Sequence, residues 1–317
     1  MYDVIAIGEV LIDFAPVETS EGGYPVLAAK PGGAPANYLA ALCAYGCKAA
    51  FLAKVGDDAF GHLLRATLQN AGIETKGIQV DAGAFTTLAF VTLDETGNRS
   101  FSFARKPGAD TRLRPEEVDR RMIDEARVFH FGTLSLTDEP MRTTTKQCVT
   151  YAREAGKLIT FDPNLRLSLW NSAAEAKTAM LCGLEFADIV KISDEEVAFL
   201  WDCSKEEGAQ RLLSEYGVRL AMVTLGADGC YLANKNGAVQ VPCPNVTPID
   251  TTGAGDIFGG SAVSRLLRMN KAPDALCVRE LEELAVFACA AASLSTQTYG
   301  GIPSIPSEAA VLTLIGK

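Results

Sequence analysis

The sequence is poor in the side chains that usually hold zinc. It has only two histidines, His62 and His130, and none of its nine cysteines forms a Cys-x-x-Cys pair. Because zinc sites typically combine such pairs with histidine, this composition argues against zinc. Cys43 and Cys289 lie inside apolar stretches, where a thiol behaves as a small hydrophobic group. The scattered thiols favour a reducing compartment, and we expect a cytoplasmic protein.

Long runs of one chemical character are also missing. The net charge is −10 and no Lys/Arg-rich run is present, so we expect no nucleic-acid partner. No apolar run reaches about 18 residues, which argues against a membrane partner. Residues 1–8 enter a predicted strand at once and lack the basic start and long apolar stretch of a signal peptide.

Short Val-, Ile- and Phe-rich runs alternate with longer amphipathic stretches. This alternation predicts an α/β fold with a mostly parallel sheet. Buried strands are predicted at Val4–Leu11, Val128–Phe131, Leu158–Phe161, Ile189–Ile192 and Ala221–Leu225. Helices are predicted to start near Asp57, Pro115, Asp138, Ser172, Asp194 and Ala254.

Residues 13–30 and 78–103 break this rhythm and read as antiparallel strands around a turn at residues 95–98. They could form a small sheet that closes over a site, or an edge hairpin that extends the main sheet. We find no internal repeat and no Pro/Ser-rich linker, so one domain over residues 1–317, with these strands inserted as a lid, is preferred to two tandem domains.

The segment Asp250–Asp256, with the sequence Asp-Thr-Thr-Gly-Ala-Gly-Asp, precedes a predicted helix. The free N–H groups of a helix start, next to Gly253, Ala254 and Gly255, would form an anion hole that a phosphate can approach. Asp256 would then lie in the first helical turn as a base for a hydroxyl proton. Taken alone, the segment is more easily explained by an aspartate that only stabilises the helix start.

A second glycine pair, Gly32 and Gly33, also precedes a predicted helix, whose first turn carries Asn37. An amide side chain both donates and accepts hydrogen bonds, which suits a polyhydroxylated ligand. Residues 54–61 read as a strand end, a turn and a helix cap with a structural role.

These segments resemble the two signatures of the ribokinase-like (PfkB) sugar kinases: Gly-Gly-x-x-x-Asn followed by Val-Gly-Asp-Asp, and Asp-Thr-Thr-Gly-Ala-Gly-Asp. Their order and separation match as well, and the resemblance covers essentially the whole chain. It implies a three-layer α/β/α sandwich with a small β-sheet lid, ATP as cosubstrate, and a homodimer formed through the lid.

The resemblance also implies roles for individual residues. Asp256 is the expected base, and Gly253, Ala254 and Gly255 the expected anion hole. The residues expected to bind the sugar, besides Asp256, are Asp13, Gly32, Gly33, Asn37, Phe103, Arg105 and Arg166. Those expected to bind ATP are Lys191, Ser193, Thr224, Gly226, Gly229 and Gly255.

Metal roles follow from the same resemblance. Glu196 matches the glutamate of an Asn-x-x-Glu motif that organises Mg²⁺ through water, but Ser193 replaces the asparagine. Ser193 and Glu196 also read as a capping box, which is compatible with the metal role. Asp250, Thr252, Gly300 and Ser304 match positions that bind a monovalent cation, K⁺ for example, in many members of the family.

Within the family, residues 162–170 and 97–110 look most like the fructokinases, which predicts phosphorylation of D-fructose to fructose 6-phosphate. A 2-keto-3-deoxygluconate kinase is the nearest alternative, since Arg105 and Arg166 could pair with its acid substrate; surface ion pairing is the alternative for both arginines. A regulator that binds sugar or nucleotide without catalysis is a further alternative, against which the intact segment at Asp256 argues. A dinucleotide oxidoreductase is disfavoured because the first strand runs into residues 8–11 without a Gly-x-Gly-x-x-Gly fingerprint.

Overall fold

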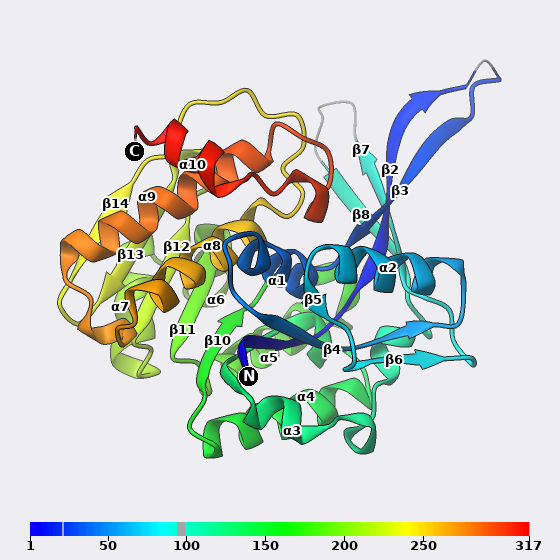
Figure 1. The fold of residues 1–317 in the computed structure, drawn as a ribbon, viewed down its shortest axis with the longest axis horizontal. Coiled ribbons are helices and arrows are strands. Elements are labelled where there is room, and N and C mark those ends of the chain that lie inside the picture. Colours follow the sequence, from blue (N-terminus) through cyan, green and yellow to red (C-terminus); the bar gives the residue numbers. More distant parts are fainter. Residues whose placement is uncertain (21, 94–98, 317) are drawn as a thin grey trace.

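A computed structural model describes residues 1–20, 22–93 and 99–316 of the chain, which form two β-sheets with helices packed on both faces of the larger one (Figure 1). Across the larger sheet the strands run in the order β14-β13-β12-β11-β10-β9-β1-β4-β5, and β6 also pairs with β4. The pairs from β12 to β5 and β6 are parallel, whereas β13 pairs antiparallel with both of its neighbours, β12 and β14. The strands of this sheet are β1 (Tyr2–Ile7), β4 (Ala49–Gly56), β5 (Ile73–Glu74), β6 (Ile78–Asp81), β9 (Ala126–Gly132), β10 (Leu158–Asp162), β11 (Ile189–Ser193), β12 (Leu220–Thr224), β13 (Cys230–Asn234) and β14 (Gly237–Val241). The mostly parallel sheet is the predicted one.

Helices cover both faces of this sheet, which gives the expected three layers. One face carries α1 (Ala34–Ala44), α2 (Ala59–Asn70), α8 (Ala254–Met269), α9 (Val278–Ser295) and α10 (Glu308–Leu314). The other face carries α3 (Arg120–Asp124), α4 (Met141–Glu154), α5 (Ala173–Leu184), α6 (Asp194–Trp201) and α7 (Lys205–Glu215). Short 3₁₀ helices are η1 (Ala109–Arg112), η2 (Pro115–Glu117), η3 (Thr133–Leu136), η4 (Leu167–Leu169), η5 (Gly226–Asp228), η6 (Pro273–Ala275) and η7 (Ile302–Ser304).

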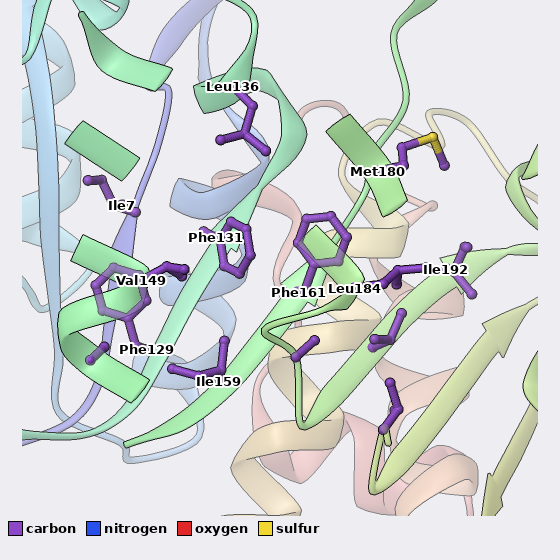
Figure 2. Close-up of a cluster of buried hydrophobic side chains, with 14 of the residues drawn as sticks. Ile7, Phe129, Phe131, Leu136, Val149, Ile159, Phe161, Met180, Leu184 and Ile192 are labelled. Carbon is purple, nitrogen blue, oxygen red and sulfur yellow. The ribbon is translucent and has the colours of Figure 1, made fainter. Parts of the chain in front are cut away.

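The strands are apolar on both sides because both faces of the sheet are covered. In β1, Ile5 and Ile7 point into the layer of α4 and α5, whereas Val4 and Ala6 point towards α1. Figure 2 shows the first of these layers, in which Phe131 of β9 lies against Phe161 of β10 with ring centroids 4.7 Å apart. This packed core fixes the strand ends from which the site is built.

The second sheet has the order β3-β2-β7-β8, made of β2 (Leu11–Thr19), β3 (Pro25–Gly32), β7 (Leu88–Leu93) and β8 (Arg99–Ala104). It projects from the larger sheet, and β2 and β3 reach furthest from the body (Figure 1). These strands therefore form a separate sheet, and an edge hairpin extending the main sheet was the wrong alternative. The predicted turn at residues 95–98 lies outside the described residues.

Several predicted boundaries need correction. Val4–Leu11 is not one strand: β1 ends at Ile7, and Leu11 begins β2 of the other sheet. The bend fits Gly8, where a Cβ would come within 2.6 Å of the Pro35 ring. Residues 78–81 belong to the larger sheet as β6, and β2 pairs with β7 in parallel rather than antiparallel.

The predicted helix starts are displaced by a few residues at most, except near Pro115. There the chain forms only the short η2, followed by α3 from Arg120. The helix expected from Asp57 begins at Ala59, because the Asp58 side chain accepts the N–H of Gly61 as a cap. Among the described residues, no helix combines the length and apolarity that a bilayer crossing requires.

Candidate active site

Two cavities meet at the carboxyl ends of the central parallel strands. The smaller has a volume of about 230 Å³ and the larger of about 730 Å³. Both are lined by Asn164, Arg166, Thr251, Gly253 and Asp256. In open α/β sheets ligands bind at this end of the strands, and here two ligands could meet across one carboxylate.

The smaller cavity is closed on one side by the second sheet. Leu11 and Asp13 of β2 and Phe103 of β8 line it, together with Gly33 and Asn37 at the start of α1. Of the residues expected to bind sugar, the structure places Asp13, Gly33, Asn37, Phe103, Arg166 and Asp256 in its wall. Gly32 does not line the cavity. A Cβ on Gly32 would overlap the Asp13 carboxyl, so this glycine leaves room for Asp13.

Arg105 does not line the smaller cavity either. It is 3% exposed and its guanidinium donates to Asp110, to Thr137 Oγ1 and to the carbonyl of Leu134. The surface ion pair considered as its alternative role is in fact a buried one. Since Leu134 lines the cavity, the structure makes Arg105 a support behind the cavity wall.

Asp256 lies in the first turn of α8, whose N-cap Gly253 has a φ of 77°. Glycine is needed there, because a Cβ would come within 3.0 Å of Asn37 Nδ2 in addition to the left-handed backbone. Asn37 Nδ2 donates a 2.9 Å hydrogen bond to Asp256 Oδ2. Burial raises the pKa of Asp256 above its usual value, against the opposing effects of the Lys191 ammonium and the Asn37 hydrogen bond.

The start of α8 offers the features of an anion hole. Its first-turn N–H groups have no intrahelical acceptor, and the helix dipole favours negative charge there. Lys191 of β11 points to the same place, since a Cβ on Gly255 would lie 2.9 Å from its Nζ. The Lys191 ammonium is held by Asp162 of β10 at 3.0 Å.

All of the residues that were expected to bind ATP line the larger cavity. Its lining includes Lys191, Ser193, Thr224, Gly226, Gly229 and Gly255. Gly229 has a φ of 99°, and a Cβ there would overlap the carbonyl of Val241. Val246, Phe258 and Ala292 add apolar surface against which the aromatic base of a nucleotide could pack.

Ser193 and Glu196 form the capping box that the sequence indicated. Ser193 Oγ accepts the N–H of Glu196, and Glu196 Oε2 accepts the N–H of Ser193 at 2.8 Å. Glu196 Oε1 also accepts the N–H of Leu165 at 2.6 Å. In the part of the chain that the structure describes, no group of three or more His, Cys, Asp or Glu side chains could by itself hold a metal ion.

The loop expected to hold a monovalent cation is organised by Asp250. Its carboxyl accepts the N–H groups of Thr252 and Gly300, each at 2.9 Å. Lys30 of β3 lies 3.8 Å from Asp250 Oδ2 and 4.4 Å from the centroid of the Tyr299 ring. Ser304, which follows Gly300 closely in the sequence, is buried, and its hydroxyl donates to the carbonyl of Gly301. The loop thus combines oxygen donors with one resident positive charge.

Burial shapes the charge of the site. It raises the pKa of Glu9, Asp13 and Asp162 to about 7 in each case. For Asp13 the carboxylates of Asp256 and Asp250 add to this effect, and Arg166 opposes it. Each of these groups is therefore more easily protonated than an exposed carboxyl.

Sequence reasoning missed some of the residues that build the site. Glu9, Leu134, Asn164 and Thr251 line the smaller cavity, and Asp162 holds Lys191. Glu9 and Asp162 come at or just after the carboxyl ends of buried strands, which is a signal that could have pointed to them.

A three-layer sandwich with two cavities that share a carboxylate and a helix start defines a ribokinase-like small-molecule kinase. The chain belongs to the pfkB family of carbohydrate kinases, which it matches over residues 1–308. It is thus an ATP-dependent sugar kinase.

Individual relatives cover nearly the whole chain. Fructokinase-1 of Zea mays is 43% identical over 99% of this chain and 98% of its own length. The structure of a fructokinase from Xylella fastidiosa with bound ATP is similar with a TM-score of 0.89 and 30% identity, covering 100% of this chain and 99% of that one. A fructokinase double mutant from Vibrio cholerae O395, bound to fructose, ADP and potassium, gives a TM-score of 0.87 at 30% identity, covering 99% of this chain and 98% of that one.

Proposed function

We propose that this protein transfers the γ-phosphoryl group of ATP to D-fructose and forms fructose 6-phosphate. One observation carries the proposal: Asp256 lies in the wall of both cavities, so a hydroxyl in the smaller one and a phosphoryl group in the larger one would meet at its carboxylate. The names of the full-length relatives support fructose as the acceptor.

In this mechanism Asn37 fixes the Asp256 carboxylate by the 2.9 Å hydrogen bond. Asp256 takes the proton of the sugar hydroxyl while the hydroxyl oxygen bonds to the γ-phosphorus. The bond from that phosphorus to the β–γ bridging oxygen breaks, and ADP leaves. The N–H groups at the start of α8 and the Lys191 ammonium stabilise the charge on the transferring group.

Magnesium fits the larger cavity as an ion bound mainly by ATP. Glu196 lines that cavity, and each of its oxygens, although it accepts one N–H, keeps a second lone pair for a metal-bound water. The ion would neutralise charge on the phosphates. Ser193, bound in the capping box, is proposed to contact ATP rather than the metal.

The loop around Asp250 fits a monovalent cation by its chemistry. It offers the Asp250 carboxylate and nearby carbonyl and hydroxyl oxygens at Thr252, Gly300 and Ser304. We propose that this loop binds K⁺ next to the Lys30 ammonium, which already offsets part of the Asp250 charge.

The charge of the smaller cavity favours a neutral sugar over a sugar acid. Three carboxyl groups, of Glu9, Asp13 and Asp256, face one guanidinium, that of Arg166. Arg105, which could have paired with a substrate carboxylate, is bound to Asp110. Whenever these carboxyl groups are ionised, a 2-keto-3-deoxygluconate carboxylate would meet like charges, which costs binding energy.

We also propose that the second sheet acts as a lid, that two copies pair through it, and that the enzyme works in the cytoplasm. Pairing is supported by Val17, Tyr24, Val26 and Leu27 of the β2–β3 hairpin, all of which are apolar or aromatic and exposed. A cytoplasmic location agrees with the nine free cysteines.

The test is a coupled ADP-release assay with fructose, 2-keto-3-deoxygluconate, ribose and a nucleoside as acceptors. We expect kcat/KM for fructose to exceed the others by at least about tenfold, with product phosphorylated at the 6-hydroxyl. A preference for the sugar acid would contradict the fructose assignment. ATP or sugar binding without turnover of any acceptor would instead support a non-catalytic regulator.

A further inference from the structure

Glu9 lies just beyond β1 and is 2% exposed in the wall of the smaller cavity. Its Oε1 accepts a 3.1 Å hydrogen bond from the N–H of Ala34, the first residue of α1. The N-cap of this helix is Gly33, which has no side chain to accept such a bond. Glu9 therefore caps the helix that carries Asn37 from a different element of the fold.

The second oxygen of Glu9 has no hydrogen-bond donor from another of the described residues. Among the described residues, neither a hydrogen bond nor an ion pair within 4.0 Å joins Glu9 Oε2 to another group. The cation with the strongest effect on Glu9 is Arg105, whose guanidinium donors are engaged by Asp110, Thr137 and Leu134. Because Glu9 lines the smaller cavity, a ligand hydroxyl bound there could donate a hydrogen bond to this oxygen.

The backbone of Glu9 is fitted to the same place. A Cβ on Gly33 would come within 2.6 Å of the Glu9 carbonyl oxygen, so Gly33 packs directly on Glu9. Side chain and backbone of Glu9 thus both hold the Gly33–Asn37 segment, while Asp256 contacts that segment from α8 through Asn37. A sugar in the cavity would be bounded by Asp256 on the side of the larger cavity and by Glu9 where β1 ends.

We propose that Glu9 is a specificity-determining residue for the acceptor. Its Oε2 accepts a hydrogen bond from a sugar hydroxyl other than the one that Asp256 deprotonates, and its Oε1 holds the Gly33–Asn37 segment against the same sugar. This inference rests on the proposed sugar-kinase reaction. An acceptor that lacks this hydroxyl leaves the carboxyl oxygen unpaired, and one with an anionic group there meets a like charge; the enzyme rejects both.

The test is a thermodynamic cycle that combines a change of the Glu9 side chain with a change of the substrate. The wild type and Glu9→Ala are each assayed with fructose and with fructose analogues that each lack one hydroxyl. We expect one analogue, not modified at the phosphorylated position, to have a kcat/KM about 100-fold below that of fructose with the wild type. With Glu9→Ala the same analogue should lie less than about threefold below fructose, because the side chain that binds the missing hydroxyl is already absent. Glu9→Gln keeps an oxygen for the Ala34 N–H, and it replaces Glu9→Ala in the cycle if that variant does not fold.

The proposal is overturned if, for every analogue, the loss in kcat/KM caused by Glu9→Ala and the loss caused by the missing hydroxyl simply multiply. Glu9 would then be a helix cap alone. The outcome is separable from that of the proposed function. If the wild type uses another sugar, the cycle is run with the monodeoxy analogues of that sugar. If no sugar is turned over, the proposed reaction fails, and the same cycle is read from sugar dissociation constants.

Discussion

Asn37 Nδ2 lies 2.9 Å from Asp256 Oδ2, although 219 positions separate the two residues in the chain. The bond joins the first turn of α1 to the first turn of α8. It therefore ties the segment beside the acceptor cavity to the carboxylate that lines both cavities.

Removing the charge of Asp256 should abolish catalysis and spare binding. Asp256→Asn keeps an acceptor oxygen for Asn37 but cannot take a proton, so kcat should fall by about 10³-fold. Steady-state kinetics measure the loss, and calorimetry should give sugar and ATP dissociation constants within about threefold of the wild type. Glu282→Gln, on the exposed side of α9, is the control. Near-normal turnover of Asp256→Asn would show that another group is the base.

A second carboxylate beside Asp256 should shift the pH dependence of catalysis. In Asn37→Asp the donor to Asp256 becomes a like charge, which raises the already raised pKa of Asp256 further. The base works only when ionised, so activity is lost as pH falls through this pKa. The acidic limb of kcat should thus move to higher pH, by about one unit or more. Asn37→Ser removes the donor without adding charge and should shift the limb less.

The buried pair of Asp162 and Lys191 should separate stability from catalysis. Lys191→Met leaves Asp162 buried without its cation, which should lower the free energy of unfolding by about 3 kcal/mol. It also removes a positive charge beside the anion hole, so kcat/KM for ATP should fall by about 100-fold. Adding Asp162→Asn should restore much of the stability in urea unfolding without restoring activity. Recovery of both would mean that Lys191 is purely structural.

Replacing Arg105 should show whether this residue supports the cavity wall or binds the sugar. Arg105→Lys cannot reproduce the bonds to Asp110, Thr137 and Leu134, so it should lower the free energy of unfolding by about 3 kcal/mol. The KM for fructose, measured well below the melting temperature, should change by less than about threefold. Arg114→Lys, at an exposed site, is the matched control. A large rise in KM with unchanged stability would return Arg105 to the sugar.

Lys30 should set how strongly the enzyme depends on K⁺. Lys30→Met removes the resident charge 3.8 Å from Asp250, so an added cation gains more from that carboxylate. The ratio of activity in KCl to activity in tetramethylammonium chloride should exceed one in the wild type and rise at least about threefold in the variant. Lys235→Met, which removes one of the two cations paired with the remote Asp274, should leave the ratio unchanged. An unchanged ratio in Lys30→Met would remove Lys30 from this role.

The sequence by itself determined the fold class and the centre of the site. Apolar runs such as those of β9 and β10 report burial on both faces of a sheet, and the glycines before Asp256 are required by local backbone geometry, which is written in the sequence nearby. Of the residues expected to bind ATP, Lys191, Ser193 and Thr224 lie at the carboxyl ends of the neighbouring parallel strands β11 and β12, and such strand ends meet at one edge of a sheet.

Only the tertiary structure decided the partners of buried charges. The sequence near Arg105 does not tell whether its guanidinium binds Asp110 and Leu134 or a sugar. The Arg105 side chain could point in either direction from the same backbone conformation. Glu9 reads as one more residue after a strand until the fold brings Ala34 to one of its oxygens and the cavity to its side chain. Hydrogen bonds between distant segments depend on how layers pack, and local sequence does not encode that packing.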